Sequence, residues 1–261
     1  MSYQRLRFDV SDGLAEITLC RPDAANAIDV VLAGELAEVS LQCSEDAAIR
    51  AVLLRAEGPI FCGGGDVASF RGADDFPVLL RRITQGLHVA VSRFARMNAP
   101  LVAAVAGTAA GAGMSLACSC DLVIASDNAR FTMAYTRIGL VPDGSSTWFL
   151  PRRIGLGRAR DLMLRNRVLT AADALAWGVI DEVVPAADLD AHARRIARDL
   201  AAGPTLAFGE TKRLLAQTFD NGLETQMEME AIGICAMGGT EDSREGVRAF
   251  FEKRPAKFRA R

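Results

Sequence analysis

Short apolar segments typical of strands alternate with segments of helical spacing over much of the chain. Residues 15–21 alternate between apolar and polar side chains, which predicts a half-buried strand. Asp29 can cap a helix over residues 30–41, and residues 51–56 (AVLLRA) follow as a buried strand. The same order returns over residues 101–126, from LVAAVAG to DLVIAS. This repetition of strand, helix and strand predicts an α/β fold.

A different pattern begins after the last predicted strand. Thr170 and Asp173 form a capping box for a short helix that Gly178 can end, and residues 179–184 (VIDEVV) follow as a strand. From Asp188 onward the apolar residues recur at helical spacing.

This change predicts a boundary near residue 195, with an α/β core over residues 1–195 and a helical region over residues 196–261. The helices of the second region carry more apolar side chains than a small module can bury alone. We therefore expect this region to make contacts between subunits.

The charge balance excludes several classes of partner. Lys and Arg number 30 against 32 Asp and Glu, which gives a formal net charge of −2 and no field that would attract nucleic acid or an acidic membrane surface. The N-terminal segment lacks the basic and then apolar pattern of a signal peptide, and no uncharged apolar stretch approaches the ~20 residues of a membrane helix. We expect a cytoplasmic protein that binds neither nucleic acid nor membranes.

The six cysteines form no CxxC pair, which argues against a disulfide framework or a zinc knuckle. His88 and His192 are the two histidines, so we expect no metal site. A Ser-His-Asp triad would have to use one of them, and no GxSxG turn accompanies either.

Two glycine-rich turns follow apolar strands, one at residues 61–66 (FCGGGD) and one at residues 110–114 (AGAGM). Glycine permits positive φ and close approach of a ligand, and it leaves backbone N–H groups free to bind an anion. An ordinary strand-to-helix turn explains either run taken alone. Neither run spells the GxGxxG dinucleotide fingerprint.

Several segments together show a resemblance that covers nearly the whole chain. They are RPDAANAID, FCGGGDV, APLVAAVAGTAAGAGMSLACSCDLVIAS, ARFTMAYTRIGLVPDGSSTWFLPRRIG and REGVRAFFEKRPAKF. In this order and spacing the chain resembles the crotonase (enoyl-CoA hydratase/isomerase) superfamily. The resemblance implies a spiral of ββα units that binds an acyl-CoA thioester, with a C-terminal helical region that builds a homotrimer or hexamer.

In that superfamily one N–H group from each glycine-rich turn binds the thioester oxygen. By position these donors would be Gly63 and Ala112, and Ala112 would begin a helix whose positive end adds to the stabilisation. The resemblance further implies substrate contacts at Ala25, Gly64, Gly65 and Asp66. Because coenzyme A arrives with the substrate, no separate cofactor is expected.

The superfamily's hydratases place two glutamates across the substrate. Here Ser115 and Tyr135 occupy those positions, as possible accessory residues. Neither side chain has a pKa suited to a base near neutral pH, so ordinary water addition is not expected.

The remaining candidate acid is Asp143, in IGLVPDG. A local interpretation makes it a cap for a helix through Ser145, Ser146 and Trp148. Relatives with an aspartate here include single-acid enoyl-CoA isomerases, the ring-epoxide isomerase of the phenylacetyl-CoA pathway and chlorobenzoyl-CoA dehalogenase. The segment looks most like the first two, which predicts an isomerase that shifts a double bond or opens a ring epoxide, with Asp143 as acid and base.

Two other functions stay open. In an aryl-CoA dehalogenase or a thioesterase, Asp143 would be a nucleophile, and His88 stands where the dehalogenase has a base. A lone histidine on a helix is more often packed or solvent-facing, and Tyr135 stands where the dehalogenase has a tryptophan. The second alternative is a trimer that binds acyl-CoA without catalysis, which loss of both glutamates would allow.

Overall fold

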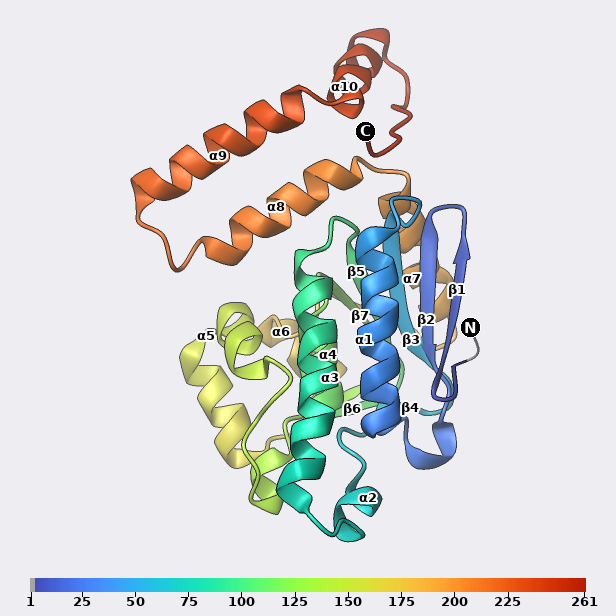
Figure 1. Ribbon diagram of the computed structural model, residues 1–261, viewed down its shortest axis with the longest axis vertical. Coiled ribbons are helices and arrows are strands. Elements are labelled where there is room, and N and C mark those ends of the chain that lie inside the picture. The colour runs from blue at the N-terminus through green and yellow to red at the C-terminus, as the bar shows by residue number, and fades with distance from the viewer. Residues whose placement is uncertain (1–2) are drawn as a thin grey trace.

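The computed structural model describes residues 3–261, which form two sheets and the helices around them (Figure 1). The larger sheet has six strands in the order β1-β2-β3-β5-β7-β10. Strand β1 pairs antiparallel with β2, and the other neighbours are parallel. The strands are β1 (Leu6–Ser11), β2 (Leu14–Leu19), β3 (Ala51–Ala56), β5 (Leu101–Val105), β7 (Leu122–Ser126) and β10 (Glu182–Val184).

The smaller sheet has the order β4-β6-β8-β9. Its strands are β4 (Ile60–Cys62), β6 (Thr108–Ala110), β8 (Arg130–Thr132) and β9 (Leu169–Thr170). Strands β4, β6 and β8 each follow a strand of the larger sheet after a short connection, and a helical segment comes next. The chain thus repeats a unit of two strands and a helix, and the two glycine-rich turns lie at the ends of β4 and β6.

Helices cover both faces of the larger sheet. Val52 and Leu54 of β3 pack in the same cluster as α1 (Val30–Glu45) and α3 (Phe76–Arg96). Ala51 and Leu53 pack in a second cluster with α7 (Leu189–Ala201). The prediction that residues 15–21 form a half-buried strand is wrong on this point, because α7 covers the second face and leaves Thr18 only 2% exposed.

The remaining helices before α7 are α2 (Val67–Arg71), α4 (Ala112–Cys118), α5 (Ser146–Arg165) and α6 (Ala171–Trp177), with 3₁₀ turns η1 (Pro22–Ala24) and η2 (Tyr135–Ile138). Two predicted caps are confirmed. The Asp29 side chain accepts from the Leu32 N–H at the start of α1. Thr170 and Asp173 form the capping box of α6, which ends at Gly178 in the left-handed conformation.

The C-terminal helices are α8 (Thr205–Gln217), α9 (Leu223–Gly238) and α10 (Glu241–Glu252). Figure 1 shows α8 and α9 side by side, extending away from the sheets at one end of the molecule. Residue 195 lies inside α7, which belongs to the sheet layer, so the helices that leave this layer begin at Thr205. Within residues 3–261 no helix combines the length and the apolar character needed to cross a membrane.

Candidate active site

A cavity of about 340 Å³ lies between the two glycine-rich turns, α3 and the segment that contains η2. Asp143 is the one acidic residue among those that line it within the described chain, and Arg137 is the one basic residue. The remaining walls are mostly apolar. The lining comprises Gly63, Gly64, Gly65, Val67, Phe70, Leu80, Ile83, Thr84, Leu87, Gly111, Ala112, Ala134, Tyr135, Arg137, Ile138, Leu140, Val141 and Asp143.

The two glycine-rich turns touch each other at one end of this cavity. Gly64 has φ +99, a conformation that side chains disfavour. A Cβ atom there would lie 2.9 Å from the carbonyl oxygen of Ala110 and 3.3 Å from the nitrogen of Ala112. Only glycine therefore allows the first turn to lie against the start of α4.

The internal hydrogen bonds of the first turn correct the predicted pair of donors. The N–H of Gly63 donates to the carbonyl oxygen of Ala25 at 2.8 Å, so it is not free for a ligand. The carbonyl of Gly64 and the N–H of Asp66 are occupied by Ile28. Among residues 3–261 no oxygen accepts from the N–H of Gly64, Gly65 or Ala112, and all three residues line the cavity. The N–H of Gly64 faces the thiol of Cys62, which is a weak acceptor. The free donors are thus Gly65 and Ala112.

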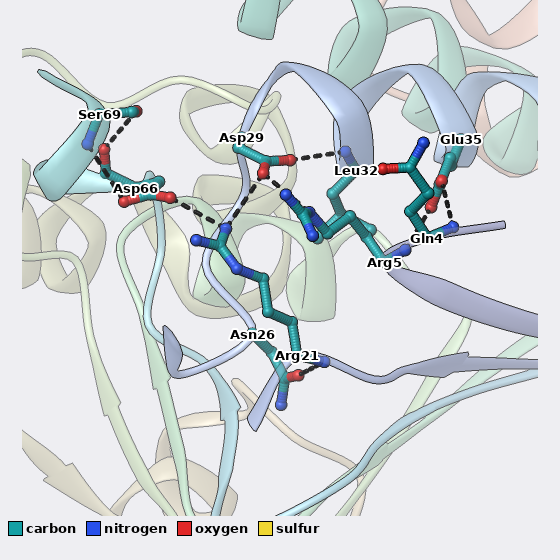
Figure 2. Close-up of polar contacts among 9 residues, drawn as sticks. All are labelled: Gln4, Arg5, Arg21, Asn26, Asp29, Leu32, Glu35, Asp66 and Ser69. Carbon is teal, nitrogen blue, oxygen red and sulfur yellow. Dashed lines mark hydrogen bonds and ion pairs between the residues drawn. The ribbon is translucent and has the colours of Figure 1, made fainter. Parts of the chain in front are cut away.

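A network of ion pairs holds this turn from outside the cavity (Figure 2). The guanidinium of Arg21 lies 2.9 Å from Oδ2 of Asp66 and 3.1 Å from Oδ2 of Asp29. Asp66 also accepts from Ala68 and Ser69 as the cap of α2. Arg21 therefore links Asp29, the cap of α1, to Asp66, the cap of α2. The glycine run directly precedes Asp66.

Two residues predicted to contact substrate have other partners. The carboxylate of Asp66 is committed to Arg21 and to the α2 cap, and Asp66 is absent from the cavity lining in the described chain. Ala25 is in the left-handed conformation at φ 54, and its carbonyl receives the Gly63 N–H. Both residues thus stabilise the conformation of the turn.

Asp143 and the two residues at the glutamate positions form one chain of hydrogen bonds. The phenol of Tyr135 donates to Oδ1 of Asp143 at 2.5 Å. The hydroxyl of Ser115 lies 3.0 Å from the phenol oxygen of Tyr135. Burial, followed by the charge of Asp143, raises the pKa of Tyr135, so the phenol keeps its proton.

The alternative that Asp143 caps the following helix is not supported by its side-chain contacts. Within residues 3–261 its carboxylate accepts from Tyr135 and from no backbone N–H. Instead, the backbone carbonyl of Asp143 accepts from the N–H and the hydroxyl of Ser146. The carboxylate is thus available to a molecule in the cavity.

His88 lies beside the Asp143 loop but uses its Nε2 on the backbone. This atom accepts from the N–H of Gly144 at 3.2 Å. A nitrogen that accepts this bond has its lone pair occupied, and His88 is absent from the cavity lining in the described chain. The geometry makes His88 a support for the loop rather than a base that faces substrate.

Sequence reasoning named Gly65 as a substrate contact but not as an N–H donor, and it missed most of the apolar wall. Three consecutive glycines are chemically identical, and no feature of the sequence distinguishes the one whose N–H stays free. The apolar wall includes Leu80, Ile83 and Leu87, which recur at helical spacing on α3. That spacing was a usable signal for one face of α3, although it could not show that the face lines a cavity.

The family model for enoyl-CoA hydratase/isomerase matches residues 9–261. The chain is 39% identical over 261 residues to a probable enoyl-CoA hydratase of Rhodobacter capsulatus, with all of both chains covered. It is 38% identical to the 1,2-epoxyphenylacetyl-CoA isomerase of Escherichia coli, covering 95% of this chain and 96% of that one. The structure of an enoyl-CoA hydratase/isomerase from Cupriavidus metallidurans superposes with a TM-score of 0.90 at 33% identity, over 99% of this chain and 97% of that one. The fold implied by the resemblance is confirmed.

Proposed function

The chain belongs to the enoyl-CoA hydratase/isomerase family, and from this premise we propose that it isomerises an acyl-CoA thioester through an enolate. In this proposal Asp143 moves the proton, and the N–H groups of Gly65 and Ala112 bind the thioester oxygen. The substrate is a thioester whose double bond shifts along the acyl chain, or one that carries a ring epoxide.

The two N–H groups supply the electrophilic part of the site. Gly65 and Ala112 come from turns that touch, and neither N–H has an acceptor within residues 3–261. Two fixed donors in a cavity with mostly apolar walls stabilise negative charge on a carbonyl oxygen more strongly than water does. Such donors favour the enolate over the ground-state thioester, which is what a proton transfer next to a carbonyl needs.

Asp143 supplies the proton transfer. For a 3-enoyl thioester, its free carboxylate oxygen takes a proton from the carbon next to the carbonyl. The electron pair of that bond moves into a dienolate whose charge rests on the thioester oxygen. The dienolate then takes the proton back at the carbon two positions farther along, and the double bond ends in conjugation with the carbonyl. No atom is gained or lost, and Asp143 returns to its ionised form.

The observation that carries the proposal is the presence of one acidic side chain in an otherwise apolar wall. Asp143 is the one acid that lines the cavity in the described chain. Ser115 and Tyr135 hydrogen-bond to each other, and Tyr135 also bonds to Asp143. Water addition needs one group to activate water and another to protonate carbon, whereas a proton shuttle needs a single carboxylate.

The proposal is tested by a mass-spectrometric and spectrophotometric screen of the purified protein against CoA thioesters. The panel contains 2-enoyl, 3-enoyl, aryl and ring-epoxide thioesters, each incubated with the parent and with Asp143→Asn. We expect an isomer of unchanged mass from a 3-enoyl or ring-epoxide substrate with the parent only. A product of water addition as the main product would contradict the proposal.

The same screen separates the two alternatives. If Asp143 is a nucleophile, a dehalogenase would form an aryl ester on this residue with loss of halide, and a thioesterase would form an acyl anhydride with loss of the CoA thiolate. The intact protein would gain the mass of the aryl or acyl group. A scaffold would bind the thioesters and change none of them. His88 would be the base in the first alternative, but its Nε2 is bound to Gly144.

A further inference from the structure

The two carboxylate oxygens of Asp143 differ in their surroundings. Oδ1 receives the phenol O–H of Tyr135 at 2.5 Å, whereas Oδ2 has no hydrogen-bond partner among residues 3–261. We propose that Tyr135 is a positioning residue, which holds Oδ1 and makes Oδ2 the oxygen that takes up the substrate proton and returns it. This inference rests on the proposed isomerase function and adds a role for a residue outside the proton transfer itself.

The direction of the hydrogen bonds follows from the number of hydrogens. An ionised carboxylate can only accept, and a phenol has one hydrogen, so Tyr135 donates to Asp143. The one hydroxyl hydrogen of Ser115 has two acceptors within reach, the phenol oxygen of Tyr135 at 3.0 Å and the carbonyl oxygen of Gly111 at 3.2 Å. When Oδ2 gains a proton from the substrate, Oδ1 becomes the carbonyl oxygen of the acid and still accepts. The bond from Tyr135 to Asp143 therefore keeps the same direction before and after the proton transfer.

Both residues that make this contact sit on a fixed backbone. The carbonyl of Tyr135 accepts from the N–H of Leu140 at 3.1 Å, which closes the loop of η2. On the other side, Gly144 donates its N–H to His88 at 3.2 Å. Gly144 has φ +58, and a Cβ atom there would lie 3.0 Å from Cβ of Ser115. The Asp143 loop thus packs directly on the residue that begins the hydrogen-bond chain.

Burial makes this contact more effective than it would be in water. Ser115 is 0% exposed and Tyr135 is 9% exposed, so water competes little for the phenol. A carboxylate held through one oxygen cannot rotate about its last bond without breaking a charge-assisted hydrogen bond. A freely rotating carboxylate would expose the transferred proton to exchange with solvent, whereas the held one keeps it facing the substrate.

The test uses a 3-enoyl-CoA with deuterium on the carbon next to the thioester. The parent should transfer part of this label to the new position in the product. Tyr135→Phe keeps the ring and removes the O–H, so we expect kcat to fall about ten-fold, as loss of a hydrogen bond to a charged group predicts. KM should stay within about two-fold because the apolar contacts remain, and the fraction of label transferred should fall to less than about half of the parental value.

Two control variants separate positioning from general damage. Tyr3→Phe removes the other phenol of the chain, whose oxygen accepts from the side-chain amide of Gln42 on α1 at 2.7 Å. This variant should change neither kcat nor label transfer. Ser115→Ala keeps the Tyr135 contact with Asp143 and should lower kcat by less than about three-fold. A Tyr135→Phe variant with parental kcat and label transfer would overturn the inference, as would a parent that loses all label to water.

A crystal structure of Tyr135→Phe tests the inference even if the parent isomerises none of these thioesters. The isomerase function fails if the parent protein isomerises none of the thioesters. The positioning role fails if the Asp143 carboxylate has the same orientation in the crystal structures of the parent and of Tyr135→Phe. We expect Asp143 of this variant to turn away from its parental orientation or to occupy two orientations. A carboxylate that stays in place without the phenol would show that Tyr135 does not position it.

Discussion

The backbone N–H of Gly63 donates to the carbonyl oxygen of Ala25 at 2.8 Å, and this bond makes the Gly63 N–H unavailable to a ligand. Gly64 lies against Ala110 and Ala112, and its N–H faces the thiol of Cys62. Gly65 is then the glycine of this turn whose N–H has no partner among residues 3–261. The left-handed conformation of Ala25 brings its carbonyl to Gly63. A residue thirty-eight positions earlier thus excludes Gly63 as the donor.

Ala112→Pro tests the donor on the second turn. Ala112 is the first residue of α4, where proline is tolerated because its missing N–H has no partner in the helix. We expect folding to be retained and kcat/KM for the substrate found in the screen to fall roughly 100- to 1,000-fold, the usual cost of removing one such donor. Leu223→Pro is the matched control, because Leu223 is the first residue of α9 and lies outside the cavity lining. Parental activity of Ala112→Pro would exclude this N–H as a donor.

The function of the first turn could be predicted from the sequence, but the residue that supplies its free N–H group could not. Glycine-rich turns after apolar strands predicted an anion-binding backbone, and the structure has two free N–H groups there. The choice between Gly63 and Gly65 depends on a carbonyl from another loop, which no local pattern encodes. The contact of Tyr135 with Asp143 depends in the same way on the path of the intervening loop through η2.

Local periodicity and capping residues predicted many of the individual strands and helices. Strands β3, β5 and β7, the caps of α1 and α6 and the C-terminal helices all follow from spacing and capping residues. The burial of both faces of β2 was not predictable, because α7 arrives from late in the chain. Pairing of Glu16 with Arg55 and Arg194 shows how a charged side chain is accommodated beneath that helix.

Arg21→Met should destabilise the protein through the network around the first turn. Arg21 is 25% exposed and pairs with Asp66, whose side chain is 10% exposed, so the substitution leaves a mostly buried carboxylate without its cation. We expect the free energy of unfolding in urea to fall by about 2 to 3 kcal/mol. Arg7→Met is the control, because the Arg7 pair with Glu57 is 53% and 37% exposed and should be worth less than about 1 kcal/mol. Equal losses in the two variants would contradict this role of Arg21.

Hydration of crotonyl-CoA should be slower than in a two-glutamate hydratase of the family by several orders of magnitude. Ser115 and Tyr135 replace the two acids, and burial raises the pKa of Tyr135 further from neutral pH. Each missing acid or base group costs roughly 100- to 10,000-fold. The loss of the conjugated enoyl absorbance, followed with both enzymes at equal concentration, measures the difference. Comparable turnover numbers would contradict the assignment of Asp143 as the one acid that acts on substrate.

The C-terminal helices should assemble the protein into a trimer or a hexamer. Nine large apolar side chains of this part of the chain are exposed, more than a stable monomer normally leaves in water. They are Leu215, Phe219, Leu223, Met227, Ile232, Ile234, Val247, Phe250 and Phe251. Light scattering at micromolar concentration should give three or six times the mass of one chain, and deletion of the residues after Gly203 should give insoluble material.

A charge within this apolar surface should weaken the assembly. Ile234 is 73% exposed on α9, so Ile234→Glu should leave the fold of one chain intact and shift the mass toward that of one chain. Val10→Glu makes the same kind of change at a 46% exposed position on β1 and should leave the mass unchanged. A parent that stays monomeric at micromolar concentration would contradict the prediction.

Asp143→Asn tests the residue on which the proposed chemistry depends. Asparagine has the same size, and its carbonyl oxygen can still accept the phenol O–H of Tyr135, so the free energy of unfolding should change by less than about 1 kcal/mol. The amide cannot act as a base, so isomerisation of a 3-enoyl or ring-epoxide CoA should fall by at least roughly 100-fold. Binding of the thioester should persist, because the backbone N–H groups of Gly65 and Ala112 are unchanged.

Asp74→Asn is the control for this substitution, because it removes one negative charge from an exposed position near α3. If Asp143→Asn isomerises such substrates at the parental rate, Asp143 is not the proton carrier; if it loses folding and binding together, the residue is structural and the non-catalytic alternative gains support.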